Sequence, residues 1–193
     1  MKKIKDYKLF LESKQTKEEI DQICQKYYIT NYTINEDGTV DVDGDVNLFN
    51  LITDSDGKLN GRMPINFGKV TGYFDCGLNK LTTLEGSPKW VGKYFLCNMN
   101  MLKTLEGGPI VMIGGCNCES NNIINFKGFP DDFDGDLSIN GNPVYKLLEK
   151  IPYEKWNKFI YWCNELNVID DEGNVNVEWM EEVYHKLGLK YED

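Results

Sequence analysis

The sequence predicts an α+β repeat protein, a short solenoid with an open parallel sheet that is capped by an N-terminal helix plus strands and by C-terminal helices. Two observations predict this fold: a period of 21 residues runs through the middle of the chain without a gap, and segments with helical periodicity flank it. Stacked repeats have such periods, because one unit cannot bury its apolar side alone and neighbours must share a core. We expect an N-terminal cap at 1–45, the solenoid at 46–144 and a C-terminal helical cap at 145–193. A β-sandwich of short strands is the alternative that spaced turns also allow.

Each unit has two apolar residues two apart, then an asparagine and further apolar residues. The first unit holds Phe74, Cys76, Asn79, Leu81, Leu84, Gly86, Pro88 and Val91, and the second holds Phe95, Cys97, Asn100, Leu102, Leu105, Gly107, Pro109 and Met112. The third holds Cys116, Cys118, Asn121, Ile123, Phe126, Gly128, Pro130 and Phe133, and a shorter fourth holds Leu137, Ile139, Asn142 and Val144. Residues two apart on a strand share a face, so each apolar pair points inward. The asparagine that follows can bond backbone groups that the turn leaves unpaired.

The pattern apolar-x-apolar-x-x-Asn-x-apolar is that of the strand segment of a leucine-rich repeat. The units YFDCGLNKLTTLEGSPKWVGK and YFLCNMNMLKTLEGGP resemble the Cys-containing, leucine-rich-repeat-like proteins of large tailed bacteriophages, and so do the stretches DYKLFLESKQTKEEI and NEDGTVDVDGDVNL near the N-terminus. The resemblance covers most of the chain and implies a repeat fold and a viral source. It implies no known activity and no catalytic residues. The third unit departs from the pattern, with CNCESNNIINFKGFP.

The return part of each unit contains Gly and Pro, and it is too short and too Pro-rich for a full helix. Before the repeats, Thr16 and Glu19 form a capping-box pattern that predicts a helix over 16–28. Two strands near ITNYTI and TVDVDG are expected to form a hairpin around the turn 36–38. Val46 and Leu48 then predict an irregular first repeat strand, which an insertion around 54–61 follows.

The character of the chain changes after Pro143. A short helix is expected near Val144, and Pro152 opens a second one whose apolar stripe is Trp156, Phe159, Ile160 and Cys163. The stretch VIDDEGNVNV predicts a small hairpin or loop. A last helix carries Trp179, Met180, Val183, Tyr184 and Leu187, and Gly188 ends it.

Charge restricts the classes of partner. The formal net charge is −10, which argues against nucleic acid and against an anionic membrane surface, since both need basic patches. It favours solubility or a basic partner. The start MKKIKDYKLFLESK has no sustained apolar region, so we expect a cytosolic protein, in the host cell if phage-encoded, with reduced thiols.

The residues that metals prefer do not occur with metal-site spacing. Cys76, Cys97 and Cys118 share one inward column, and Cys116 with Cys118 gives a Cys-x-Cys pair. Small apolar slots under the sheet explain them better than a metal or redox site, because Cys-x-x-Cys or Cys/His spacing is missing. The loop DVDGDVN lacks the Gly and Glu positions of a calcium-binding EF-hand. We expect no metal and no cofactor.

No catalytic constellation is recognisable either. His185 is the only histidine, and it stands in the last helix without an apparent Ser or Cys partner. No phosphate-binding Gly-rich loop and no nucleophile elbow occur. We therefore expect a protein that is not an enzyme.

The outward face of the repeat strands is the candidate site. Its residues are Tyr73, Asp75, Tyr94, Leu96, Asn98, Asn117 and Glu119. Tyr73, Tyr94 and Leu96 are expected to form an aromatic-aliphatic cluster at one end. Leu78 and Met99, one step further along the chain, either extend this cluster or turn into the rim of the sheet. Such a cluster is a candidate hot spot. Two alternatives are that a terminal cap covers this face and that cross-strand Tyr pairs only stabilise the sheet.

These features favour a non-enzymatic protein-binding module. With the phage resemblance, the hypothesis is an intracellular viral protein that binds and modulates a host protein, for example one of an antiviral defence. A virion structural or assembly protein is one alternative. A sponge for a small ligand such as a signalling nucleotide is another, which the negative charge opposes.

Overall fold

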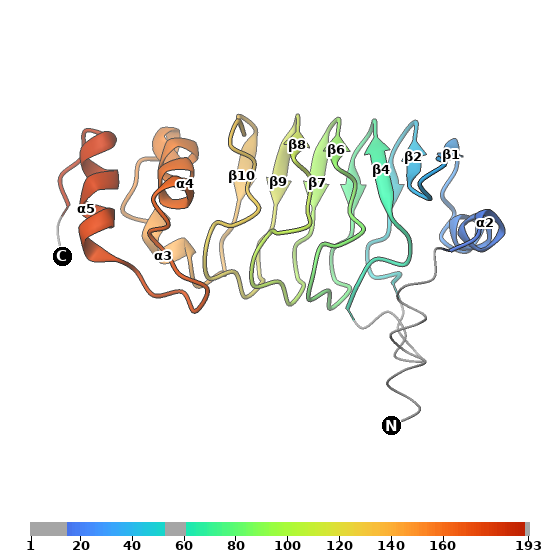
Figure 1. Cartoon of the computed structure of the whole chain (residues 1–193), viewed down its shortest axis with the longest axis horizontal. Helices are drawn as coiled ribbons and strands as arrows, with labels where there is room; N and C mark the ends of the chain where they lie inside the picture. The colour runs from blue at the N-terminus through green and yellow to red at the C-terminus, as the bar shows by residue number, and fades with distance from the viewer. Residues whose placement is uncertain (1–14, 53–60, 192–193) are drawn as a thin grey trace, which may run out of the picture.

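The computed structural model describes residues 15–52 and 61–191, so that residues 1–14 of the expected cap and almost all of the expected insertion lie outside it. The central part is a solenoid in which the chain alternates between two sheets of five strands each (Figure 1). Sheet A contains β1 (Tyr32–Ile34), β2 (Val40–Val42), β4 (Phe67–Val70), β6 (Trp90–Val91) and β8 (Val111–Met112). Sheet B contains β3 (Val46–Asn47), β5 (Phe74–Asp75), β7 (Tyr94–Leu96), β9 (Gly115–Asn117) and β10 (Asp136–Ser138).

The 21-residue period is the register of the sheets. In sheet B, Phe74 is paired with Phe95, Phe95 with Cys116, and Cys116 with Leu137. All strand pairs in both sheets are parallel except β1 with β2, which form the expected hairpin. The described residues thus form a parallel-sheet solenoid, which agrees with the predicted short repeat architecture.

The expectation of one open sheet was incomplete, because the return segments form a second one. Val91 pairs with Val70 on one side and with Met112 on the other, and all three side chains are buried. The strands β6 and β8 are two residues long, too short to show alternation in the sequence. A Gly-Lys or Ile-Gly step then leads from each into the next strand of sheet B.

The core lies between the two sheets. The ring of Phe67 in sheet A meets Phe74 of sheet B edge-on at 5.0 Å, and Phe74 stacks on Phe95 at 5.9 Å. Cys76 and Cys97 are fully buried beside these rings. Contacts of this kind repeat from turn to turn, so the stacked units share one continuous core.

Helix α2 (Lys17–Lys26) lies at the N-terminal end of the solenoid (Figure 1). The predicted capping box is present: the Thr16 hydroxyl accepts from the Glu19 N–H at 3.2 Å, and the Glu19 carboxylate accepts from the Thr16 N–H at 2.8 Å. Ile20 and Cys24 are buried against the core. The helix ends earlier than predicted, because Tyr28 has a left-handed backbone with φ of 57°.

The remaining helices lie at the other end of the solenoid (Figure 1). They are α3 (Tyr145–Leu148), the 3-10 helix η1 (Tyr153–Lys155), α4 (Trp156–Glu165) and α5 (Val177–Lys186), in the order that the sequence predicts. The Phe159 ring of α4 meets Phe126 of the last turns edge-on at 6.0 Å. Where a small hairpin or loop is expected, at 168–177, the structure has a loop closed by one bridge between Ile169 and Val175. None of the helices in 15–52 and 61–191 combines the length and apolar character that a membrane span needs.

Candidate functional site

The asparagine column fixes the turn after each strand of sheet B. The Asn100 side-chain oxygen accepts from the N–H groups of Asn79 and Leu81 at 2.9 and 3.0 Å, and its amide donates to the carbonyls of Cys76 and Cys97 at 3.0 Å each. Asn79, Asn121 and Asn142 bond the backbone in the same way. The expected structural role of the column is confirmed.

The outer face of sheet B brings together the residues that the sequence singles out. The register places Asp75, Leu96 and Asn117 side by side in one row, between Asn47 and Ser138. Tyr73 and Tyr94 precede Phe74 and Phe95, and Asn98 and Glu119 follow Cys97 and Cys118, on strands whose inward residues are buried. None of the predicted site residues is fully buried, and Tyr94 is the most exposed, at 46%.

The Tyr94 ring crosses the middle of this face. Its hydroxyl donates to the Asp136 carboxylate at 3.4 Å, two strands away. A Cβ on the intervening Gly115 would lie 3.0 Å from the Tyr94 ring. Because Gly115 has no side chain, there is space for the Tyr94 ring above it. The aromatic surface therefore extends from β7 toward the acidic end of the sheet.

Asp75 is a half-buried carboxylate beside Leu96. Burial raises its pKa, which the hydrogen bond from the Gly77 N–H at 2.9 Å partly offsets. Within the described part of the chain no lysine or arginine forms an ion pair with it. An ionised carboxylate at this position is therefore poorly compensated, and a cation brought by a partner would stabilise it.

The polar end of the face is held by its own hydrogen bonds. Asn117 accepts from the Glu119 N–H at 3.1 Å, and Asn140 donates to the Glu119 carboxylate at 3.3 Å. The Asn98 oxygen lies 3.1 Å from where a Cβ on Gly77 would be. The side chains at this end are thus held by one another and by the adjacent backbone.

The sequence reasoning missed an apolar patch on the outer face of sheet A. Ile110 and Ile113 are 71% and 60% exposed, next to half-buried Val111 and Trp90. The Lys69 ammonium lies 4.5 Å above the Trp90 ring. The signal that could have found this patch is the alternation of inward Met112 with outward Val111, which becomes readable only when the return segment is recognised as a strand.

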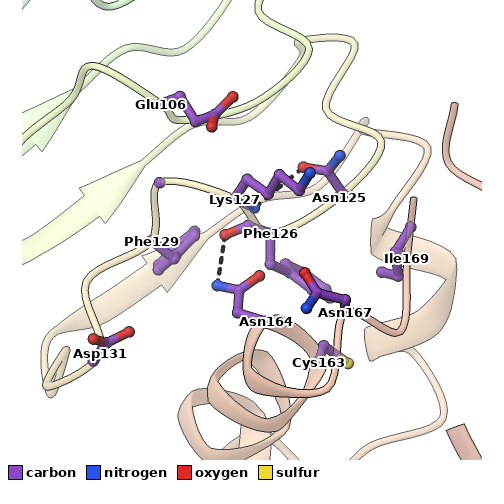
Figure 2. A pocket seen from close by; sticks show the side chains of 11 residues that line it. Glu106, Asn125, Phe126, Lys127, Phe129, Asp131, Cys163, Asn164, Asn167 and Ile169 are labelled. Carbon is purple, nitrogen blue, oxygen red and sulfur yellow. Dashed lines mark hydrogen bonds between the residues drawn. The ribbon is translucent and has the colours of Figure 1, made fainter. Parts of the chain in front are cut away.

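A pocket of about 260 Å³ lies between the last turns of the solenoid and α4 (Figure 2). The Asn164 amide, which α4 carries, donates to the Phe126 carbonyl at 3.0 Å. The buried Asn125 amide donates to the Asp170 carbonyl at 3.2 Å, and its oxygen accepts from the Lys127 N–H. The polar groups of the wall are thus largely engaged in joining the solenoid to the C-terminal segment.

The chemistry of this pocket is limited. Burial raises the pKa of the Cys163 thiol far above its ordinary value, so the thiol is protonated at neutral pH and a poor nucleophile. Lys127 is ion-paired with Asp171, which raises the pKa of the ammonium. Neither group is poised as a base or nucleophile.

The expected thiol ladder is present, with Cys116 beside it. Hydrogen bonding to Cys116, together with burial, raises the pKa of both Cys97 and Cys118. All six cysteines of the chain are buried and unpaired. In the ranges that the structure describes, no three His, Cys, Asp or Glu side chains are grouped so that they could hold a metal ion. His185 is exposed on α5.

Comparison with known proteins assigns no family: no family model, no curated protein and no solved structure matches this chain. The functional interpretation therefore depends on the geometry described above.

Proposed function

We propose that this chain is a leucine-rich-repeat-like, non-enzymatic protein-binding module whose contact surface is the outer face of sheet B. One observation carries the proposal: exposed Tyr94 and half-buried Leu96 lie on the same open face as Asp75, a half-buried carboxylate without a cationic partner among the described residues. Binding hot spots combine aromatic and aliphatic anchors with charges that a partner completes.

The partner that this face selects carries a basic side chain. Burial deprives the Asp75 carboxylate of stabilising water, and a lysine or arginine beside it would stabilise the ionised form instead. The chain as a whole has a net charge of −10, which attracts basic surfaces from a distance and repels nucleic acid and anionic membranes. We propose a protein partner with a basic patch around an apolar centre.

The resemblance to phage repeat proteins gives the proposal its biological setting. In that setting the chain acts in the cytoplasm of the host cell and modulates a host protein, for example one of a defence system. The helix α2 and the helices α3 to α5 serve as caps that cover the ends of the repeat stack. The source and the setting follow from the resemblance in the repeat residues alone.

The test is affinity purification from host lysate with a triple variant, Tyr73→Ala, Tyr94→Ala and Leu96→Ala. The matched control removes side chains from the opposite surface, with Ile110→Ala, Val111→Ala and Ile113→Ala on sheet A. Both variants are checked for folding by circular dichroism and urea denaturation. We expect a partner that wild type and the sheet A variant retain and that the sheet B variant loses.

Other outcomes separate the alternatives. Equal retention by all three proteins would refute the assignment of the surface. Loss with the sheet A variant alone would move the contact to the patch around Ile110 and Ile113. Detection of the chain in purified particles by mass spectrometry would identify it as a virion component. A thermal shift with cyclic nucleotides would support a nucleotide sponge.

A further inference from the structure

The two sheets are offset at the N-terminal end of the solenoid. Sheet A ends in β1, which lies beyond β2, whereas sheet B ends in β3. Because β2 and β3 follow one another in the same turn, β1 has no counterpart in sheet B among the described strands. Among the residues that the structure describes, no strand therefore occupies a sixth position in sheet B, beside β3.

The open side of β3 carries main-chain groups that can pair. The N–H groups of Val46 and Leu48 donate to the carbonyls of Tyr73 and Asp75 at 2.9 and 2.7 Å, on the β5 side. Successive residues of a strand direct their main-chain groups to opposite sides, so those of Asn47 point away from β5. An edge of this kind is a template for another strand.

A groove lies along this edge. It has a volume of about 400 Å³, and its walls include Tyr27, Tyr28 and Ile29 on one side and Asn47, Phe49 and Leu51 on the other. Its size is within the range of ligand sites. Phe49 and Leu51 are 39% and 41% exposed. The groove thus offers an apolar surface next to strand groups that have no main-chain partner in 15–52 and 61–191.

One tyrosine of the wall, Tyr27, is in a state that a bound ligand would explain. Tyr28 is 86% exposed, and its left-handed φ of 57° belongs to the end of α2, where the Ile29 N–H donates to the Cys24 carbonyl at 2.9 Å. Tyr27 is 5% exposed, and its hydroxyl has no hydrogen-bond partner within the described residues. Buried polar groups without partners are rare and costly in native proteins.

We infer that this groove binds an extended segment of a partner protein, which adds to sheet B as a strand beside β3. This recognition mode uses main-chain hydrogen bonds for affinity and alternate side chains for specificity. The site is the β3 edge of sheet B, two strands away from Tyr94 and Leu96 of β7, so the inference does not depend on the function proposed above.

The alternation of the sheet predicts the ligand's sequence pattern. Positions that share a face with Val46 and Leu48 point inward, toward buried Ile29 and Tyr27, and need apolar side chains. Positions that share a face with Asp45 and Asn47 point outward. Asp45 is exposed there and accepts from the Tyr73 N–H at 2.9 Å, with the Lys93 ammonium 3.8 Å away. A weak surface pair of this kind leaves the carboxylate available to another cation.

The ligand is therefore an extended segment in which apolar and basic residues alternate. A suitable probe is the capped hexapeptide acetyl-Lys-Val-Lys-Val-Lys-Val-amide, titrated into the ¹⁵N-labelled full chain and followed by NMR. We expect the largest chemical shift changes at the amides of 27–29 and 45–51. Shift changes confined to other segments, or none at millimolar peptide, would overturn the inference.

Two methylated isomers of the probe test whether it binds as a strand. One carries N-methyl groups on every lysine, and the other carries them on every valine. Only one edge of an added strand bonds β3, so one isomer should lose at least tenfold in affinity and the other should keep its affinity. Loss for the lysine isomer indicates an antiparallel strand, and loss for the valine isomer a parallel one. Equal affinities would exclude strand pairing.

A variant at the groove distinguishes a loss of peptide binding from a loss of folding. Tyr28→Gly removes the exposed ring and relieves the left-handed strain, so we expect an unchanged or higher Tm with at least fivefold weaker peptide binding. Ile113→Ala, at an exposed position beside sheet A, should leave the peptide affinity unchanged. Unaltered affinity in Tyr28→Gly would refute the site. A peptide-sensitive dimer in light scattering would assign the groove to a second copy of this chain and overturn the inference.

Discussion

The Asn100 amide nitrogen lies 3.0 Å from the carbonyl oxygen of Cys76, 24 residues earlier in the chain. This bond joins one turn of the solenoid to the preceding one through a side chain that is 7% exposed. The same side chain also bonds its own turn, through the Cys97 carbonyl. One asparagine therefore holds both the shape of a turn and its stacking on the neighbour.

Asn100→Ala should cost more than an ordinary surface substitution. It leaves the buried N–H of Leu81 and the carbonyls of Cys76 and Cys97 with a bond fewer, and each such group costs about 1–3 kcal/mol. We expect the free energy of unfolding to fall by about 3 kcal/mol or more in urea denaturation. Asn140→Ala, at an exposed position, is the control and should change it by less than about 0.5 kcal/mol. Equal losses would contradict the structural role.

Gly128→Ala should destabilise the fold through both backbone strain and a steric clash, whereas Gly188→Ala should cause backbone strain alone. Both glycines have positive φ, +84° and +66°, but a Cβ on Gly128 would lie 2.2 Å from the Glu106 nitrogen, whereas Gly188 has nothing within 4 Å. Backbone strain alone costs about 1–2 kcal/mol. We expect Gly188→Ala to lose about that much and Gly128→Ala at least twice as much, measured by urea denaturation. Similar losses would show that the turns of the solenoid can separate to admit a methyl group.

Asp75→Asn should stabilise the fold and weaken binding. Burial raises the Asp75 pKa, so the protonated form is favoured in the folded state, and the stability that this contributes is lost as pH rises through the folded pKa. At pH 7 the ionised, half-buried carboxylate lowers the stability of the fold. The neutral amide of asparagine removes this cost, and it can still accept the hydrogen bond from the Gly77 N–H. We expect a higher Tm than wild type at pH 7 and a difference that shrinks toward pH 3.

The same variant should bind a basic partner less tightly, because it lacks the charge that a cation would meet. Binding is measured with the partner captured by wild type. If the variant is more stable at pH 7 and binds equally well, Asp75 takes no part in recognition of the partner. A lower Tm at pH 7 would contradict the burial argument.

The thiols should be unreactive in the native state. All six cysteines are buried, and burial raises the pKa of Cys24 to about 11. Hydrogen bonds with Cys118 and Cys97 lower the pKa of Cys116, but burial keeps the reagent away from this thiol as well. We expect Ellman's reagent to label none of them rapidly in native protein and all of them in 6 M guanidinium chloride. Rapid labelling without denaturant, located by peptide mass spectrometry, would identify a turn that opens locally.

Much of the solenoid could be predicted from the sequence because its forces are local and repeated. The asparagine column that contains Asn79 and Asn100, the inward apolar pairs and the capping box of Thr16 each have a fixed spacing that one principle explains. The second sheet was missed, although Val91 and Met112 were recognised as one column, because a two-residue strand shows no alternation.

The surfaces were harder to predict because they depend on distant parts of the chain. The outward rows follow from alternation, but the reach of Tyr94 to Asp136 depends on Gly115, in the strand between them. The groove beside β3 depends on where the segment 27–29 passes, and no local pattern encodes the left-handed backbone of Tyr28.

The uniform register of the turns has a consequence for how such a protein can change in size. Each 21-residue unit presents the same asparagine, aromatic or thiol contacts to the units before and after it. A duplicated unit inserted between two turns would meet matching neighbours on both sides and lengthen the molecule by about 4.8 Å. Duplication of one unit can therefore lengthen this protein, deletion of one unit can shorten it, and both leave the two different ends intact.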